Sequence, residues 1–315
     1  MMKCVLGIDT SCYTTSVALA GDGRVLASER KLLTVENGKR GLRQSDGMFQ
    51  HTTAIHLLME KLMKQTEGIE IAAVCASTRP RDVDGSYMPV FLVGEAVGRS
   101  IASALQVPFF AASHQRGHVR AAMVDSGIHE GPFIAMHLSG GTTETLVVND
   151  KLEIQLIGGS NDLHAGQFVD RVGVKLGLDF PAGPHMEALA VKGQAKSLFP
   201  LSHKDGHCSF SGAEAQAMRV IDKGDMRKED IAAEVYSYLA RAIAWLLQDA
   251  HEKTGVNQAL LAGGVASSMY LRTLLPLRLK KLGLKMRVSW AKPELSGDNA
   301  AGVALLGEEM LGGIR

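Results

Sequence analysis

Hydrophobic and polar positions along the first thirty residues follow the pattern of a three-stranded meander. Apolar runs at residues 4–9 and 15–20 flank a polar turn, and Gly21-Asp22-Gly23 leads into a third run at residues 24–29. Short turns that contain glycine and aspartate join antiparallel neighbours. The pattern therefore predicts three adjacent antiparallel strands at the start of the chain.

The same arrangement returns in the second half of the chain. Apolar runs occur again around a Gly-Gly-Thr-Thr turn, at residues 133–139, 144–148 and 151–157. Between the two copies, the hydrophobic periodicity predicts helices at residues 51–64 and 94–105 and strands at residues 71–77 and 107–110. Strands that alternate with helices indicate a mixed α/β sheet. The repeated unit predicts a duplicated α/β fold.

The length of the chain supports a protein of two lobes. The chain has 315 residues, and one domain typically takes about 150. We expect an N-terminal lobe at residues 1–128 and a C-terminal lobe at residues 129–298 with an insertion around 192–226. A C-terminal helix at about 299–312 is expected to join the first lobe. A long helix around Ile231 to Leu246, a stop at Gly255 and a buried strand at 258–262 complete the predicted second lobe.

Composition narrows the class of protein. The formal charge of +1 gives no global basic field, so a nucleic acid would be held by a local patch or with a partner's help. The four cysteines form no CxxC pair, which is typical of reduced thiols and not of a zinc or disulfide framework. No apolar run reaches the ~20 residues that a bilayer requires. We therefore expect a cytoplasmic protein without a membrane contact.

Glycine-containing turns indicate where a nucleotide binds. Asp9-Thr10-Ser11 and the turn at 139–143 follow the first strand of each meander, and such turns present backbone N–H groups to phosphates. Gly263 and Gly264 follow a later strand, where missing side chains let a base or ribose approach. Asp9 is a candidate ligand of a phosphate-bridging Mg²⁺, and an aspartate that caps a turn is the open alternative.

Two histidines form a candidate metal site. His114 and His118 are four residues apart, which on a helix places their Cβ atoms about 5–6 Å apart on one face. Surface or capping histidines also show this spacing, so the hypothesis needs a third ligand. Asp298 precedes a C-terminal apolar stretch and would complete a His, His, Asp site for Fe²⁺, Zn²⁺ or Mn²⁺.

Seven motifs occur in one order between residues 5 and 305: LGIDTSC, HxxxH, LSGGTTE, AGQFVDRVGVKLGLDFPAGP, CSFSG, LAGGVA and SGDNAAG. Together they resemble the tRNA threonylcarbamoyladenosine transferase family, once described as O-sialoglycoprotein endopeptidases. The resemblance implies the actin/hexokinase-like (ASKHA) fold with duplicated RNase H-like subdomains closing on a nucleotide. It also implies transfer of a threonylcarbamoyl group from its adenylate to N6 of the adenosine beside the tRNA anticodon.

The resemblance also implies a set of site residues. The metal ligands, for iron or zinc, fall on His114, His118 and Asp298, with His137 as a candidate fourth ligand. We take Asp9, Ser139 and Gly140 as the catalytic candidates. The nucleotide-binding positions, for ATP, AMP or an acyl-adenylate, are His137, Leu138, Ser139, Gly140, Gly141, Asp170, Gly183, Glu187, Gly263, Gly264 and Ser268. Implied partners are tRNA and small proteins, among them a same-fold pseudo-enzyme. The helix at 51–64 is the candidate surface for it, and an ordinary core role of its apolar residues is the open alternative.

Several positions depart from the family pattern: Tyr13 and Thr14 replace carboxylates, Thr142 a histidine, Glu214 a lysine and Ser268 an asparagine. These departures leave two interpretations open, a transferase and a non-catalytic or repurposed paralogue that binds a nucleotide and regulates or scaffolds a partner. A small-molecule kinase on the same fold is a third. Metallopeptidase activity is disfavoured because position 115 is glutamine, where the HExxH motif supplies its general base.

Overall fold

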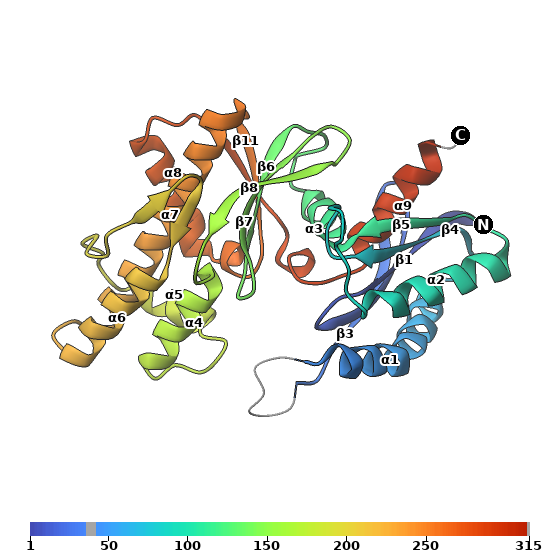
Figure 1. Ribbon diagram of the computed structural model, residues 1–315, viewed down its shortest axis with the longest axis horizontal. Helices are drawn as coiled ribbons and strands as arrows, with labels where there is room; N and C mark the ends of the chain where they lie inside the picture. The colour runs from blue at the N-terminus through green and yellow to red at the C-terminus, as the bar shows by residue number, and fades with distance from the viewer. Residues whose placement is uncertain (36–41, 314–315) are drawn as a thin grey trace. The chain divides into compact units, whose positions relative to one another are not determined.

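The computed structural model describes residues 1–35 and 42–313, in two compact units (Figure 1). Unit 1 comprises Met1–Val124 and Glu294–Arg315, and unit 2 comprises Asp125–Pro293. The segment at the C-terminus therefore belongs with the N-terminal half of the chain. None of the helices in these described ranges is both long and apolar enough to cross a membrane.

Unit 1 contains a five-stranded sheet in the order β3-β2-β1-β4-β5. Its strands are β1 (Met2–Thr10), β2 (Thr14–Gly21), β3 (Arg24–Leu32), β4 (Ile69–Arg79) and β5 (Phe109–Ser113). The first three pair antiparallel, which confirms the predicted meander. Because β1, β4 and β5 run parallel, their carboxyl ends meet at one edge of the sheet.

Helices cover both faces of this sheet (Figure 1). Residues of α1 (Gln44–Lys64) and α2 (Phe91–Leu105) pack on Leu6 and Ile8 of β1, whereas α9 (Ala301–Gly313) packs on the opposite face. Gly7 points to that opposite face, where an added Cβ would lie 2.5 Å from the Ala304 nitrogen. Since side chains alternate along a strand, Asp9 shares the α9 face with Gly7.

Helix α3 (His114–Met123) follows β5 without a loop. Ser113 caps it, because its hydroxyl accepts a hydrogen bond from the Arg116 nitrogen. Gly117 lets α3 approach α9, since its Cβ would meet the Val303 side chain at 2.8 Å. The end of β5 therefore fixes where His114 lies.

Unit 2 contains a seven-stranded sheet in the order β12-β11-β6-β7-β8-β10-β9. The strands are β6 (Phe133–Leu138), β7 (Thr143–Val148), β8 (Ile154–Ser160), β9 (Ser202–Lys204), β10 (His207–Ser209), β11 (Gln258–Ala262) and β12 (Arg287–Trp290). Antiparallel pairing of β6 with β7 and of β7 with β8 confirms the second predicted meander. β11 and β12 extend the sheet in parallel beyond β6.

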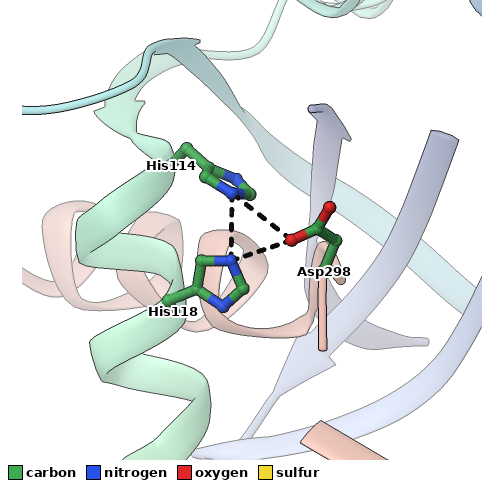
Figure 2. Close-up of side chains that lie close together, drawn as sticks. All are labelled: His114, His118 and Asp298. Carbon is green, nitrogen blue, oxygen red and sulfur yellow. Dashed lines mark hydrogen bonds and ion pairs between the residues drawn. The ribbon is translucent and has the colours of Figure 1, made fainter. Parts of the chain in front are cut away.

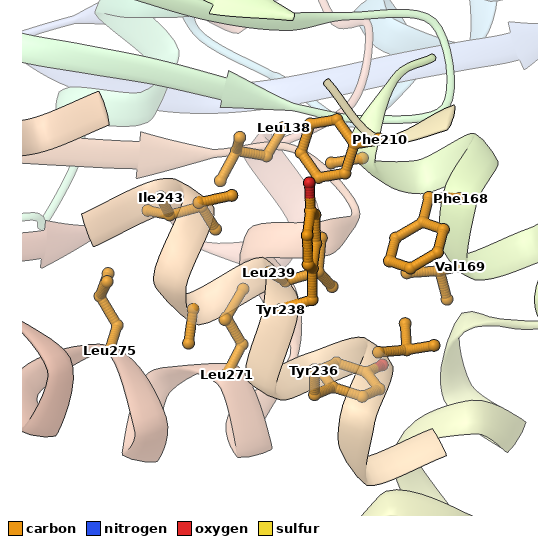
Figure 3. Packing of buried hydrophobic residues seen from close by; sticks show 14 of the residues in the cluster. Leu138, Phe168, Val169, Phe210, Tyr236, Tyr238, Leu239, Ile243, Leu271 and Leu275 are labelled. Carbon is orange, nitrogen blue, oxygen red and sulfur yellow. The ribbon is translucent and has the colours of Figure 1, made fainter. Parts of the chain in front are cut away.

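The core of unit 2 is built around one long helix (Figure 3). The helices are α4 (Ala165–Lys175), α5 (Gly183–Ala190), α6 (Ser211–Lys223), α7 (Lys228–Thr254) and α8 (Met269–Lys281), with short 3-10 turns η1 (Val265–Ser267) and η2 (Pro293–Leu295). Tyr238 of α7 lies edge-on to Phe168 and Phe210 at centroid distances of 5.6 and 5.7 Å. Gly255 ends α7 in the left-handed conformation, as its position predicts.

The observed boundaries differ from the predicted ones at several elements, among them α1, β5 and β8. The helix expected at 51–64 begins at Gln44, because Gly47 packs against Val90 and adds a buried position before the periodic stretch. The strand expected at 107–110 begins at Phe109, after Pro108, which has no N–H to donate to a neighbouring strand. Periodicity alone shows neither the contact of Gly47 nor the effect of Pro108.

Candidate functional site

His114, His118 and Asp298 lie together in unit 1 (Figure 2). The two Nε2 atoms of the histidines are 2.9 Å apart. Oδ1 of Asp298 is 3.1 Å from His118 Nε2 and 3.5 Å from His114 Nε2. Three potential ligand atoms from distant parts of the sequence thus converge on one point.

The local structure accounts for this convergence. His114 and His118 occupy successive turns of α3, as their spacing predicts. Asp298 lies in the loop before α9, and the neighbouring Asn299 fixes that loop: its Nδ2 donates to the carbonyls of Leu295 and Gly297, and its Oδ1 accepts from the Ala301 nitrogen. Since α9 packs on α3, the loop carries Asp298 to the histidines.

The spacing of the three atoms suits a single metal ion. Metal–nitrogen and metal–oxygen bonds of Zn²⁺ are about 2.0–2.2 Å, so two ligands at tetrahedral or octahedral angles lie roughly 3.0–3.4 Å apart. The observed separations of 2.9, 3.1 and 3.5 Å bracket this range. Two imidazoles and one carboxylate also leave coordination positions open. The donor set therefore fits a divalent ion.

Opposite charges stabilise the cluster electrostatically. Burial by itself lowers the pKa of His114, but the carboxylates of Asp9 and Asp298 outweigh burial and raise that pKa well above its usual range. Burial raises the pKa of Asp298, and hydrogen bonds from His114 and His118 outweigh it and hold the pKa far below the ordinary value. An arriving metal ion would displace a proton from this cluster.

Asp9 contacts His114 directly. Its two carboxylate oxygens lie 3.0 and 3.1 Å from His114 Nδ1, and Ser77 donates a short hydrogen bond to Oδ1. The Asp9 side chain is fully buried. Both oxygens of this buried carboxylate therefore have partners within unit 1. That Asp9 binds a phosphate-bridging Mg²⁺ stays a prediction.

The turn after β1 is also more enclosed than the sequence suggested. Thr10 and Ser11 are buried, and their hydroxyls are engaged with Val90 and Asp298. The Ser11 nitrogen donates to the carbonyl of Thr14 at 3.2 Å. Contacts within unit 1 therefore use both hydroxyls and the Ser11 nitrogen, and a phosphate contact at this turn stays a prediction.

The corresponding turn of unit 2 is open. An added Cβ at Gly140 or Gly141 would meet nothing within 4 Å, and both residues are exposed. Two backbone hydrogen bonds fix the turn: the Ser139 nitrogen donates to the Thr142 carbonyl, and the Gly166 nitrogen donates to the Ser139 carbonyl. Leu138 is buried at the end of β6, and His137 precedes it in unit 2. That His137 is a fourth metal ligand stays a prediction.

Two carboxylates of the predicted nucleotide set lie in unit 2 near α5. Asp170 Oδ1 accepts a hydrogen bond of 2.8 Å from the Ala182 nitrogen, immediately before Gly183. Burial raises the pKa of Asp170, although this backbone contact opposes the rise. Glu187 Oε1 accepts from the Tyr270 nitrogen at 2.6 Å. Both carboxylates therefore also brace the neighbouring backbone.

The predicted glycine pair shows two different environments. Gly263 has φ of 101°, and its Cβ would lie 2.3 Å from the Leu138 carbonyl oxygen. Gly264 faces open space instead. Ser268, predicted to contact ribose, caps α8, because its hydroxyl accepts from the Leu271 nitrogen at 3.1 Å. An interaction with ribose would have to use the remaining capacity of this hydroxyl.

The positions that depart from the family pattern have varied surroundings. Tyr13 is 47% exposed, whereas Thr14 is only 2% exposed. Glu214 forms an ion pair with Arg171 at 3.3 Å. Thr142 lies in the unit 2 turn, where its carbonyl accepts from Ser139. The altered residues are thus accommodated in the fold without an evident clash.

Sequence reasoning did not predict the contacts that three buried polar residues make with the site or its support. Ser77 bonds Asp9, Ser11 bonds Asp298, and His51 bonds the backbone of Ser11. A polar residue that ends an apolar run, as Ser77 does in β4, is a weak signal that could have identified it. His51 sits in a helical pattern where an ordinary core position gives the same signal.

Solved structures of other proteins show which fold this chain has. The chain aligns with component A of (R)-2-hydroxyglutaryl-CoA dehydratase from Acidaminococcus fermentans (TM-score 0.55, 17% identity, 98% of this chain and 99% of that one). It also aligns with a ROK family glucokinase from Streptomyces griseus (TM-score 0.55, 14% identity, 97% and 99%) and with T. kodakarensis HypF (TM-score 0.64, 15% identity, 99% and 48%). The fold is actin/hexokinase-like, as the motifs implied.

Comparison with related sequences shows the family. The family model TsaD, tRNA N6-adenosine threonylcarbamoyltransferase, matches residues 42–305. Two proteins named tRNA N6-adenosine threonylcarbamoyltransferase, from two strains of Thermus thermophilus, are each 33% identical over 312 residues. These alignments cover 96% of this chain and 91% and 90% of the relatives. The chain belongs to the tRNA N6-adenosine threonylcarbamoyltransferase family.

Proposed function

We propose that this chain transfers a threonylcarbamoyl group from threonylcarbamoyl-AMP to N6 of the adenosine next to the tRNA anticodon, and that it depends on one divalent metal ion. The observation that carries this proposal is the cluster of His114, His118 and Asp298 in a chain of this family. Three ligand atoms spaced for one ion favour an active transferase over a protein that has lost its centre. Iron and zinc both accept this donor set.

The reaction requires positioning and charge stabilisation. The N6 amine attacks the carbamoyl carbon, the C–N bond forms, and the bond to the phosphate oxygen breaks so that AMP leaves and the amine loses its proton. An ion held by His114, His118 and Asp298 would supply a Lewis acid for such acyl transfer. No covalent enzyme intermediate is needed.

The nucleotide portion would be held by unit 2. The exposed Gly140 and Gly141 let phosphate oxygens reach the backbone of the turn after β6. Asp170 and Glu187 can accept hydrogen bonds from ribose or base through the oxygens that the backbone does not use. Gly264, open on its Cβ side, permits close approach of a flat base.

A same-fold protein partner would bind α1. The helix exposes Phe49, Leu57 and Met63, which are 70%, 53% and 37% accessible. Ile55, Leu58 and Leu62 pack in the core instead. Apolar side chains on one surface helix suit a protein interface. Replacing Phe49 and Leu57 by glutamate should abolish complex formation with the host's same-fold partner in sedimentation, and an unchanged complex would reject α1 as the surface.

Genetic rescue tests the proposed activity. The chain is expressed in cells depleted of their own threonylcarbamoyl transferase, and tRNA nucleosides are quantified by mass spectrometry. We expect the threonylcarbamoyl-modified adenosine to return with this chain and not with the His118→Ala variant. No modification, in cells where the chain accumulates and binds metal and nucleotide, would favour the regulatory paralogue. The loss of carboxylates at Tyr13 and Thr14 motivates that alternative.

A further inference from the structure

We propose that the end of β1 is the outer support of the metal centre, with Asp9 and Ser11 as positioning residues for two of the three ligands. Asp9 fixes the ring of His114, and Ser11 fixes the carboxylate of Asp298. This inference rests on the proposed metal centre and adds the residues that hold its ligands in place.

Asp9 determines which nitrogen of His114 faces the cluster. An ionised carboxylate can only accept hydrogen bonds, so the Nδ1 atom that lies 3.0 and 3.1 Å from its oxygens carries the proton. Nε2 is therefore the nitrogen that would present a lone pair to a metal ion once its own proton is displaced, and it lies 2.9 Å from His118 Nε2. Ser77 holds Asp9 in turn through Oδ1. A carboxylate behind a ligating histidine fixes both the tautomer and the ring orientation.

Ser11 contacts only one of the two carboxylate oxygens of Asp298 and leaves the other for the metal cluster. Its hydroxyl lies 2.7 Å from Oδ2, whereas Oδ1 is the oxygen that faces His118 at 3.1 Å. One oxygen is therefore used for support and the other remains directed at the ligand cluster. The support fixes the carboxylate plane, because rotation would break the Ser11 bond.

His51 holds the Ser11 backbone from the opposite face of the sheet. Its Nε2 lies 2.8 Å from the Ser11 carbonyl oxygen, and its Nδ1 lies 2.8 Å from Thr15 Oγ1. A carbonyl can only accept, so Nε2 donates and Nδ1 accepts from the Thr15 hydroxyl. His51 is fully buried, and burial lowers its pKa, which favours this neutral form. The turn that carries Ser11 is thus anchored to α1.

The two supports share one short segment although their ligands do not. His114 is 105 residues from Asp9, and Asp298 is 287 residues from Ser11. A shift of the β1 end would therefore move both ligands relative to His118. This arrangement gives Asp9 a positioning role in place of direct contact with substrate or phosphate.

Zinc affinity tests the inference. Dissociation constants for Zn²⁺ are measured by competition with a chromogenic chelator for the unmodified protein and for Asp9→Asn, Ser77→Ala and Ser11→Ala. We expect Asp9→Asn to weaken zinc binding about 10–100-fold, and the two serine variants to weaken it several-fold. The absorption bands of bound Co²⁺ should shift in the same variants, since the ligand geometry changes.

Matched controls separate positioning from general stability. Ser16→Ala removes a buried hydroxyl that bonds the Asp9 carbonyl and no ligand, so zinc affinity should stay unchanged. Glu234→Gln removes a fully buried carboxylate of unit 2 and should also leave it unchanged. Parental zinc affinity and Co²⁺ spectra in Asp9→Asn and Ser11→Ala would overturn this inference while the metal centre stands. An unmodified protein that binds no zinc or cobalt would overturn both.

Discussion

Thr10, the last residue of β1, caps helix α2 through Gly94. Its Oγ1 accepts a hydrogen bond of 3.1 Å from the Gly94 nitrogen and donates one of 2.9 Å to the Val90 carbonyl. Val90 occupies the N-cap position itself but has no side chain that could accept. A residue distant in sequence thus supplies the missing cap.

The cap that Thr10 supplies predicts how an isosteric substitution of Thr10 changes stability. Thr10→Val keeps the shape but removes both hydrogen bonds in a fully buried position, so the free energy of unfolding should fall by about 1–3 kcal/mol. Urea denaturation of the purified protein measures this. The exposed Thr53→Val on α1 is the control and should stay within about 0.5 kcal/mol. A Thr10→Val variant as stable as the unmodified protein would show that the cap contributes nothing.

Asp162 predicts a pH-dependent contribution to stability. Its carboxylate accepts from the hydroxyls of Ser209 and Ser211 and from the nitrogen of Phe210 at the start of α6. Burial raises its pKa, but these hydrogen bonds together outweigh burial and lower the pKa well below the ordinary value. A lowered pKa stabilises the fold above the pKa of the unfolded chain, and the contribution is lost as pH falls toward the folded pKa.

Asp162→Asn should therefore lower the melting temperature at pH 7 and have a smaller effect at pH 3. The expected cost at pH 7 is about 1 kcal/mol, the usual value of a helix cap. Thermal unfolding followed by circular dichroism at both pH values gives the comparison. An equal loss at pH 7 and pH 3 would contradict the role of the charge.

The adjacent glycines 263 and 264 predict different effects on stability for the same substitution. Gly263→Ala would add a Cβ 2.3 Å from the Leu138 carbonyl at a φ of 101°, so it should destabilise by about 2 kcal/mol or more. Gly264→Ala meets open space at φ of −59° and should leave stability nearly unchanged. If a base approaches the Gly264 backbone, nucleotide affinity measured by calorimetry should fall in that variant. Equal stability of the two variants would contradict the structure.

The four cysteines predict a selective reaction with iodoacetamide. Burial raises the pKa of Cys4 to about 11 and those of Cys75 and Cys208 to about 12, and all three thiols are buried. Burial also raises the pKa of Cys12, but Cys12 is partly accessible beside Met88. Mass spectrometry should therefore find Cys12 modified first, at slightly alkaline pH. Faster modification of Cys75 would show that unit 1 opens more readily than its packing indicates.

Much of the fold is predictable from local patterns. The turn residues Gly21-Asp22-Gly23 and the alternation around them are local signals, and both meanders form as they predict. The start of α1 at Gln44 has no such signal, because Gly47 lowers helix propensity and packs against Val90. Such a contact joins residues far apart in sequence and has no local signature.

The candidate site was only partly accessible to sequence reasoning. The i, i+4 spacing of His114 and His118 predicts that they share a helix face, and the pattern near Asp298 supplies a third ligand by resemblance. The role of Asp9 could not be derived, because it depends on whether the strand turns that carboxylate toward α3 or toward solvent. Its pairing with His114 required the sheet register and the packing of α3.

Metal content tests the central claim that His114, His118 and Asp298 hold one ion. The unmodified protein, the His114→Ala/His118→Ala double variant and a His56→Ala control are purified anaerobically and analysed by plasma mass spectrometry. His56 is an exposed histidine on α1, so its loss should leave the centre intact. We predict about one iron or zinc ion per chain in the unmodified protein and the control, and almost none in the double variant. Equal metal content in all three proteins would contradict the account.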